Sequence, residues 1–210
     1  MVKRTAKSSL LALVSIFPGS AAAQVRKAPQ TAEIGRIIVR VRNPDVPLDI
    51  LSLSQAVADR IFTGVGIKID WRSGAARSRE QPITIDLAVA PPHSQPHVLA
   101  YALPYEGVHI HVFYDRIQEE PNRAAVLAHV FVHEITHMLQ GVVRHSETGI
   151  MKARWTAADI DQMGFSTTLP FTAADVMLIR LGVARRAEAL KGPVVETPAD
   201  EIADSEELPL

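Results

Sequence analysis

Apolar and polar residues along this chain follow two different periods, which together predict a protein of mixed strands and helices. Alternation with period two between turn residues predicts a strand, whereas apolar positions spaced by three and four residues predict a helix. The strands expected on this basis are residues 34–41, 67–71, 83–89, 98–103 and 108–114. Helices are expected at 52–62, with Ser52 or Ser54 as the N-terminal cap, and at 122–140 after Pro121.

Two threonines near the C-terminal end are each followed by an acid three residues on, which is typical of a capped helix start. The pairs are Thr156 with Asp159 and Thr172 with Asp175. The second pair should begin a final helix that runs to about Leu190, although Gly182 lowers its helix propensity. Three residues of this helix are expected to face the core: Val176, Ile179 and Val183.

The most informative stretch of the chain is His133-Glu134-Ile135-Thr136-His137, within the helix predicted at 122–140. Residues four apart share one helix face, so His133 and His137 can bind a single ion at about 2.0–2.1 Å. Glu134 lies beside them and can accept a proton from water activated by that ion. The alternative is that these residues are hydrogen-bonded inside a core, although such polar groups in a mostly apolar helix need compensation.

A third histidine follows this stretch at a distance that suggests a known family. His145 lies eight residues beyond His137, with Gly141 between them, and Met151 comes six residues later. The sequence resembles the metzincin zinc metallopeptidases, in particular the matrixin-like group, whose motif is H-E-x-x-H-x-x-G-x-x-H followed by a methionine turn. Here the frame is H-E-x-x-H-x-x-x-G-x-x-x-H, so the glycine and the last histidine are displaced. Glycine tolerates the left-handed conformation that ends such a helix.

The resemblance implies that His133, His137 and His145 bind Zn²⁺ and that Met151 belongs to the methionine turn beneath the metal. Either His145 or Met151 can instead be an ordinary packing residue. His129 is a rival ligand, but it lies about 12 Å from His137 along the helix axis. We therefore expect His129 to be a core histidine or a partner of a ligand.

Glu147 is a possible acidic third ligand, but it does not improve the loop that returns from the helix. His109, His111 and Asp115 occupy a region where matrixins hold structural metals. Their alternation with apolar residues is equally that of the polar face of a strand, so no structural metal is inferred from them.

The family resemblance covers roughly residues 34–190 and implies an α+β, metzincin-like fold. Its parts are a twisted mixed sheet of about five strands, an active-site helix and a small C-terminal helical subdomain. Residues 99–112 resemble the matrixin segment in which an edge strand borders the substrate cleft. Residues 152–155 are expected to shape the pocket beneath the metal.

The N-terminus predicts export of the protein. Three basic residues precede an apolar run at 10–17, and Ala21-Ala22-Ala23 supplies a cleavage site before Gln24. We expect residues 1–23 to be a signal peptide and the mature protein to be secreted or periplasmic, with no stable membrane anchor. An uncleaved membrane tether is the alternative. Residues 24–191 then form a single peptidase domain, with an upper subdomain to about 141 and a lower subdomain at 142–191.

Composition removes several other classes of function. Loss of the signal changes the formal net charge from −1 to −4, and six acids lie in residues 192–210, which we expect to be a disordered tail. The remaining domain is close to neutral, which argues against nucleic acid as a partner. The chain has no cysteine, so disulfides, a lipid-modified cysteine and latency by a metal-blocking cysteine are excluded.

These observations favour a monomeric, secreted zinc endopeptidase that hydrolyses a polypeptide substrate, with Glu134 as the general base. One alternative is a catalytically silent zinc-binding protein that acts through interactions. Another is a hydrolase of small amides. The intact Glu134 argues against the first alternative, and an edge strand beside the cleft argues against the second.

Overall fold

The computed structural model describes residues 33–42, 46–73, 82–88, 99–102, 108–164 and 166–191. The predicted signal peptide and acidic tail lie outside these residues, as do the outer ends of the strands predicted at 83–89 and 98–103. Among the described residues, no helix has both the length and the apolar character that a membrane span requires.

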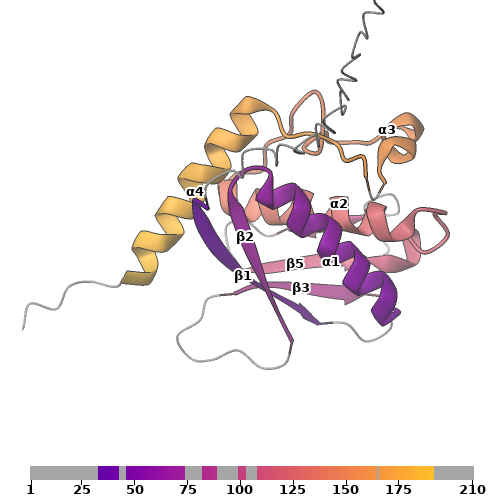
Figure 1. Ribbon diagram of the computed structural model, residues 1–210, viewed down its shortest axis with the longest axis horizontal. Helices are drawn as coiled ribbons and strands as arrows, with labels where there is room; N and C mark the ends of the chain where they lie inside the picture. The colour runs from indigo at the N-terminus through magenta and orange to yellow at the C-terminus, as the bar shows by residue number, and fades with distance from the viewer. Residues whose placement is uncertain are drawn as a thin grey trace, which may run out of the picture. The chain divides into compact units, whose positions relative to one another are not determined.

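A mixed five-stranded sheet lies beneath the helices in Figure 1. Its strands are β1 (Gly35–Arg42), β2 (Ile67–Arg72), β3 (Ile83–Ala88), β4 (Ala100–Ala102) and β5 (His109–Phe113), in the order β2-β1-β3-β5-β4. Strands β2, β1, β3 and β5 pair in parallel, whereas β4 runs antiparallel to β5 at the edge. The predicted fold class, helices on a mixed sheet of about five strands, is confirmed.

Helix α1 (Leu48–Thr63) begins four residues before Ser52, so the predicted serine cap is wrong. The helix starts directly after Pro47, whose fixed φ suits a helix entry, and Asp49 lies in its first turn. Ser52 and Ser54 instead lie inside the helix, where their hydroxyls donate to carbonyl oxygens one turn back at 2.7 Å. A serine that can bond within its own helix is therefore not diagnostic of a cap.

Helix α2 (Arg123–Gln140) packs against α1 and is buried over almost its whole length, from Ala124 to Gln140. The prediction for residues 122–140 is confirmed to within one residue. The helix ends at Gly141, which has a φ of 66° and donates its N–H to the carbonyl oxygen of His137 at 2.9 Å. This left-handed cap turns the chain back toward the helix that it has just left.

Two further helices follow, α3 (Ala157–Gln162) and α4 (Ala173–Lys191), and a short 3-10 turn, η1 (Tyr114–Arg116), comes after β5. Both predicted threonine–aspartate caps are present. In α4, Ile179 and Val183 are buried as predicted, and Val176 is half-buried. These apolar residues hold α4 against the rest of the core.

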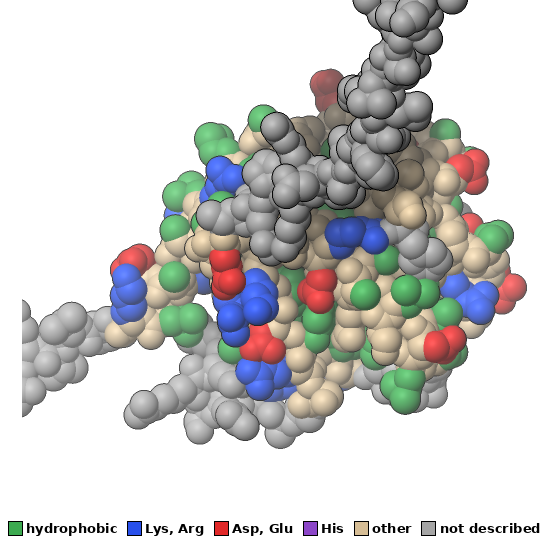
Figure 2. Space-filling view, in the orientation of Figure 1, with side chains coloured by type: hydrophobic (Ala, Val, Ile, Leu, Met, Phe, Trp, Pro, Cys, Tyr) green, Lys and Arg blue, Asp and Glu red, His purple; other side chains and the backbone are tan. Residues whose placement is uncertain are grey.

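Charged side chains of both signs are interspersed on the face shown in Figure 2. Ion pairs with partly exposed partners include Arg36 with Glu33, Arg72 with Asp70, and Lys191 with Glu188. This mixture agrees with the near-neutral composition.

Gly182 is required where α4 crosses the end of α2. A Cβ at this position would lie 1.6 Å from the carbonyl oxygen of Leu139. We expect Gly182→Ala to lower the free energy of unfolding by about 1–3 kcal/mol, because overpacking outweighs the better helix propensity of alanine. Urea unfolding measures this change. Met177→Ala, at an exposed position of the same helix, is the control and should change stability by less than about 0.5 kcal/mol. A stabilised Gly182→Ala protein would contradict the close packing described here.

Candidate metal centre

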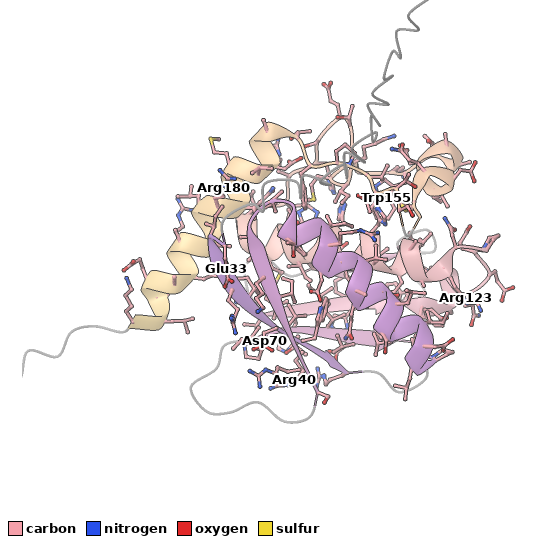
Figure 3. All side chains as sticks on the ribbon, viewed as in Figure 1. Glu33, Arg40, Asp70, Arg123, Trp155 and Arg180 are labelled. Carbon is pink, nitrogen blue, oxygen red and sulfur yellow. The ribbon has the colours of Figure 1, made fainter. Side chains whose placement is uncertain are left out.

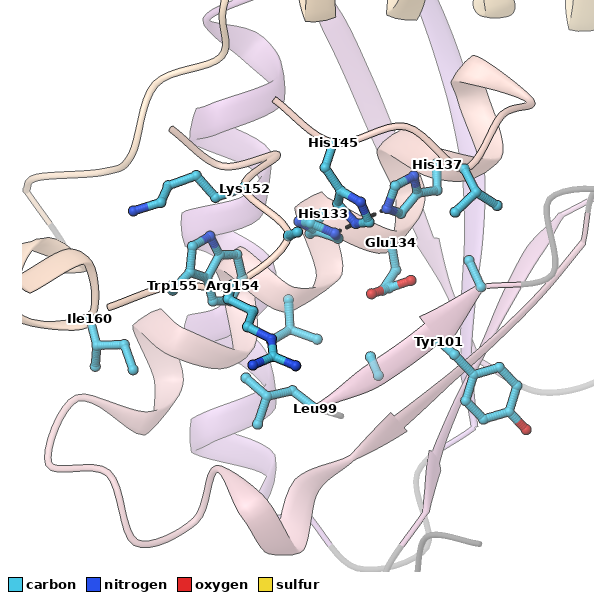
Figure 4. Close-up of a pocket in the computed structure, with 15 residues that line it drawn as sticks. Leu99, Tyr101, His133, Glu134, His137, His145, Lys152, Arg154, Trp155 and Ile160 are labelled. Atoms are coloured by element: carbon cyan, nitrogen blue, oxygen red, sulfur yellow. Dashed lines mark hydrogen bonds between the residues drawn. The ribbon is translucent and has the colours of Figure 1, made fainter. Parts of the chain in front are cut away.

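His133 and His137 project from one face of α2 and meet at the wall of a cleft (Figure 4). Both residues are buried, with relative exposures of 8% and 5%. Their ring centroids are 4.7 Å apart, and the two Nε2 atoms lie 3.0 Å apart. The helical spacing thus brings two ring nitrogens to one point, as the sequence predicted.

The other nitrogen of each ring faces a backbone carbonyl. Nδ1 of His133 lies 2.8 Å from the oxygen of Ile150, and Nδ1 of His137 lies 3.3 Å from that of Val142. A carbonyl oxygen only accepts hydrogen bonds, so each Nδ1 carries the proton and each Nε2 presents a lone pair. Two lone pairs directed at each other across 3.0 Å repel unless a cation lies beside both. The donor set therefore fits a metal ion.

His145 joins the pair from the chain that follows α2. Its ring centroid is 5.4 Å from that of His133 and 5.0 Å from that of His137. One ligand atom from each of the three residues lies within 4.8 Å of the others, inside the range of about 3–5 Å that we expect for shared coordination. Within the part of the chain that the structure describes, no other group of three His, Asp or Glu side chains converges in this way.

Between His137 and His145 the chain has two residues more than the metzincin motif, and the structure places one on each side of Gly141. One lies on the helical side of Gly141, where α2 continues to Gln140. The other lies in residues 142–145, which have no regular secondary structure and return to the helix. Because Val142 also supplies the carbonyl that meets His137, the longer loop orients one ligand while it delivers another.

The turn at Gly149, Ile150 and Met151 contacts the cluster through the ring of His133. Gly149 has a φ of 76°, and a Cβ there would lie 2.1 Å from the carbonyl oxygen of Pro170. Ile150 donates its N–H to the same oxygen at 3.0 Å, and its own carbonyl accepts from His133. Met151 is fully buried in this turn. The predicted methionine thus follows the residue that orients His133.

His129 does not belong to the cluster. Its Nδ1 donates to the carbonyl oxygen of Ala125 at 2.7 Å, and its Nε2 accepts from the N–H of Leu169 at 3.2 Å. With both ring nitrogens engaged and the residue fully buried, His129 is a structural residue that ties α2 to the chain before α4. The expectation that it lies apart from the cluster is confirmed.

The other residues considered for metal binding also lie outside the cluster. Glu147 is exposed and is not among the converging residues. His111 is half-buried on β5, where its ring stacks on Tyr101 with centroids 4.9 Å apart.

Glu134 is buried at the cleft, and its carboxyl group extends from α2 toward β4 in Figure 4. Among the described residues, no side chain donates a hydrogen bond to this carboxyl group. Burial therefore raises its pKa to about 8. A divalent cation at the adjacent histidines would lower that pKa and favour the carboxylate. The charge state of Glu134 thus depends on whether the histidine cluster holds a metal.

The cleft has a volume of about 580 Å³. Residues 99–102 of the β4 region line one side, and residues 152–155 line the other, as predicted. Trp155 lies between α2 and α3 (Figure 3), donates its ring N–H to the carbonyl oxygen of Ile150 at 3.2 Å and stands edge-on to His133. Residues 152–155 include two basic side chains. Lys152 is paired with Asp159, whereas Arg154 has no ion pair among the described residues.

Comparisons with known proteins give a likeness to solved structures. No protein-family model matches this chain, and no curated protein matches it either. Among solved structures, the chain is similar to archaemetzincin from Methanopyrus kandleri, with a TM-score of 0.49 and 12% sequence identity. The match covers 76% of this chain and 100% of that chain.

Acid should destabilise the metal-free protein through this cluster. Burial, together with neighbouring imidazoles, lowers the pKa of His133 and of His137 to about 4. Because an unfolded histidine titrates near 6.5, the unfolded chain binds more protons between pH 4 and 6.5, and stability is lost as the pH falls through that window. We expect the two histidines to contribute a loss on the order of a few kcal/mol between pH 7 and pH 4, measured by urea unfolding in chelator. Protonation of Glu134, whose pKa is raised in the folded protein, opposes part of this loss.

The matched variant for this experiment is His133→Gln with His137→Gln, which removes both titrating rings. This variant should lose less stability than the unmodified protein as the pH falls across the same window. Identical acid responses in the two proteins would show that these histidines do not carry the effect.

Proposed function

We propose that this protein is a zinc-dependent endopeptidase that uses a metzincin-type site. The single observation that carries this proposal is the convergence of three imidazoles beside a buried carboxyl group, in a cleft bordered by an edge strand. The sequence resemblance supports the same activity through His133, Glu134 and His137, whose spacing matches the family motif.

Zinc is the metal that this donor set favours. Imidazole suits Zn²⁺, and catalytic zinc sites use three protein ligands and leave a fourth position open. The relative exposure of the ligands agrees with such a site, because His133 and His137 are buried whereas His145 is exposed at the cleft. When bound here, a zinc ion would lower the pKa of a water molecule and polarise the carbonyl group of the substrate.

Glu134 performs the proton transfers in this proposal. Its carboxylate accepts a proton as water attacks the peptide carbonyl and later passes that proton to the leaving amine. The position of Glu134 suits both steps, because it lines the same cleft as the three histidines that would hold the metal. No other carboxyl group lines the cleft among the described residues.

Strand β4 offers a binding surface for an extended polypeptide. It pairs with β5 on one side only, and it is the last strand of the sheet as described. An extended peptide can add to such an edge through backbone hydrogen bonds, which hold substrates of varied sequence. Residues 99–102 also line the cleft, so a peptide bound there would pass the histidine cluster.

Two other functions share part of this evidence. A catalytically silent zinc-binding protein would need the histidines but not Glu134, whose burial without a hydrogen-bond donor is a cost that catalysis explains. A small-amide hydrolase would need the histidines and Glu134 but not an open strand edge.

Glu134→Gln separates the endopeptidase from the silent zinc protein. The amide has nearly the same size but cannot accept the proton, so we expect zinc content and fold to be kept while hydrolysis falls by about 100-fold or more. The assay follows peptide release from an unstructured protein, with zinc content measured on the same samples. Chelator should abolish the activity of the unmodified protein, and zinc should restore it. Turnover at the level of the unmodified protein in Glu134→Gln would exclude Glu134 as the base.

We also propose that residues 1–23 direct export and are removed. In a secreting host, the protein recovered outside the cytoplasm should begin at Gln24 or a close neighbour, as N-terminal sequencing or intact mass would show. Ala23→Arg, which places a large charge at the cleavage site, is the control and should slow processing. Soluble exported protein that retains Met1 would contradict this proposal.

A further inference from the structure

Asp175, in the first turn of α4, binds the two residues that flank His145. Its side chain is fully buried. One carboxylate oxygen, Oδ1, accepts from Nη1 of Arg144 at 2.8 Å and from Oγ of Ser146 at 2.7 Å. The contacts join two segments about thirty residues apart in sequence, and one of these segments carries the third histidine of the cluster.

Capping of α4 accounts for only half of these hydrogen bonds. Oδ2 of Asp175 accepts from the N–H and the hydroxyl of Thr172 at 3.0 and 2.7 Å, which is the capping interaction. In the equivalent cap of α3, Oδ2 of Asp159 alone accepts both bonds from Thr156, although Thr156 is exposed and Asp159 is only half-buried. A cap therefore needs neither full burial nor the second oxygen. The contacts of Asp175 with Arg144 and Ser146 call for another explanation.

His145 differs from the other two histidines in what holds it. His133 and His137 are fixed by α2 and by backbone carbonyls at Nδ1. The ring of His145 is exposed, makes no hydrogen bond to a described residue, and follows a segment without regular structure. Its position depends on the residues beside it. Ser146 is further tied by its N–H, which donates to the carbonyl oxygen of Met151 at 2.7 Å.

We propose that Asp175 is a positioning residue, which holds His145 at the metal by fixing Arg144 and Ser146 on either side of it. This inference rests on the proposed function, because it takes His145 as a metal ligand. Fixing both neighbours restricts where the imidazole of His145 can lie. The conformational entropy of this ligand is therefore lost during folding, and less of it has to be lost when the metal binds. The α4 helix thereby contributes to a site that none of its own side chains lines.

The charge on Asp175 is compatible with this role. Burial alone would raise the pKa of its carboxyl group, but its hydrogen-bond donors outweigh burial and hold that pKa below its ordinary value. The buried carboxylate is also paired with the guanidinium of Arg144. A buried charge of this kind is stable only while its partners stay in place, which makes the arrangement stiff.

The experiment measures zinc affinity by competition with a chromophoric chelator, at a temperature where circular dichroism shows each variant to be folded. Asp175→Ala should bind zinc about 10- to 100-fold more weakly, as expected when a residue that orients a metal ligand is lost. The visible spectrum of bound Co²⁺ should also change, since it reports ligand geometry. Loss of stability alone would leave that spectrum unaltered.

Thr156→Ala is the matched control, because it removes the same type of helix cap at α3, away from His145. It should cost about 0.5–2 kcal/mol of stability and leave zinc affinity unchanged. If Asp175→Ala does not fold, Arg144→Ala with Ser146→Ala breaks the same contacts from the other end and keeps the α4 cap. This double variant should show the same weakening of zinc binding.

His145→Ala distinguishes the inference from the function on which it rests. If His145→Ala loses zinc while Asp175→Ala, or the Arg144 and Ser146 double variant, binds it like the unmodified protein, the positioning role is wrong and the ligand assignment stands. If His145→Ala itself binds zinc with unchanged affinity, the third ligand of the proposed function is wrong, and the role of Asp175 is overturned with it.

Discussion

The site depends on one constraint, the repulsion between two lone pairs. The Nε2 atoms of His133 and His137 face each other at 3.0 Å on a buried face of α2. Protonation cannot relieve their repulsion near neutral pH, because burial holds the pKa of both rings near 4. The backbone carbonyls at Nδ1 also prevent the change of tautomer that would turn one ring into a donor at Nε2. A bound cation satisfies all of these conditions together.

Much of the remaining structure maintains that arrangement. The sheet and α1 bury α2, which keeps its histidines one turn apart. The loop after Gly141 and the turn at Ile150 supply the two carbonyls, and the contacts of Pro170 with that turn hold it in place. Because these loops arrive from different parts of the chain, the site is complete only when the region after α2 has packed against it. We therefore expect a bound metal to stabilise the packing of this region.

The sequence was most informative where the relevant contacts are local. The HExxH spacing, the left-handed Gly141 and both threonine–aspartate caps depend on residues a few positions apart, so their patterns could be predicted. The start of α1 was missed because Ser52 and Ser54 form bonds within the helix, and Pro47 was the better signal. The contacts of Asp175 with Arg144 and Ser146, and the close approach of Gly182 to Leu139, join distant segments. No local pattern marks such contacts, because they arise only from the tertiary packing of α4.

The central claim, a single zinc ion held by three histidines, is tested most directly by X-ray absorption spectroscopy of the zinc-loaded protein. The account predicts three imidazole nitrogens at about 2.0–2.1 Å and a fourth ligand from solvent, with one ion per chain. His145→Ala should show two imidazoles, and His129→Ala should keep three. A spectrum with only two imidazoles in the unmodified protein, or one that loses an imidazole in His129→Ala, would contradict the site described here.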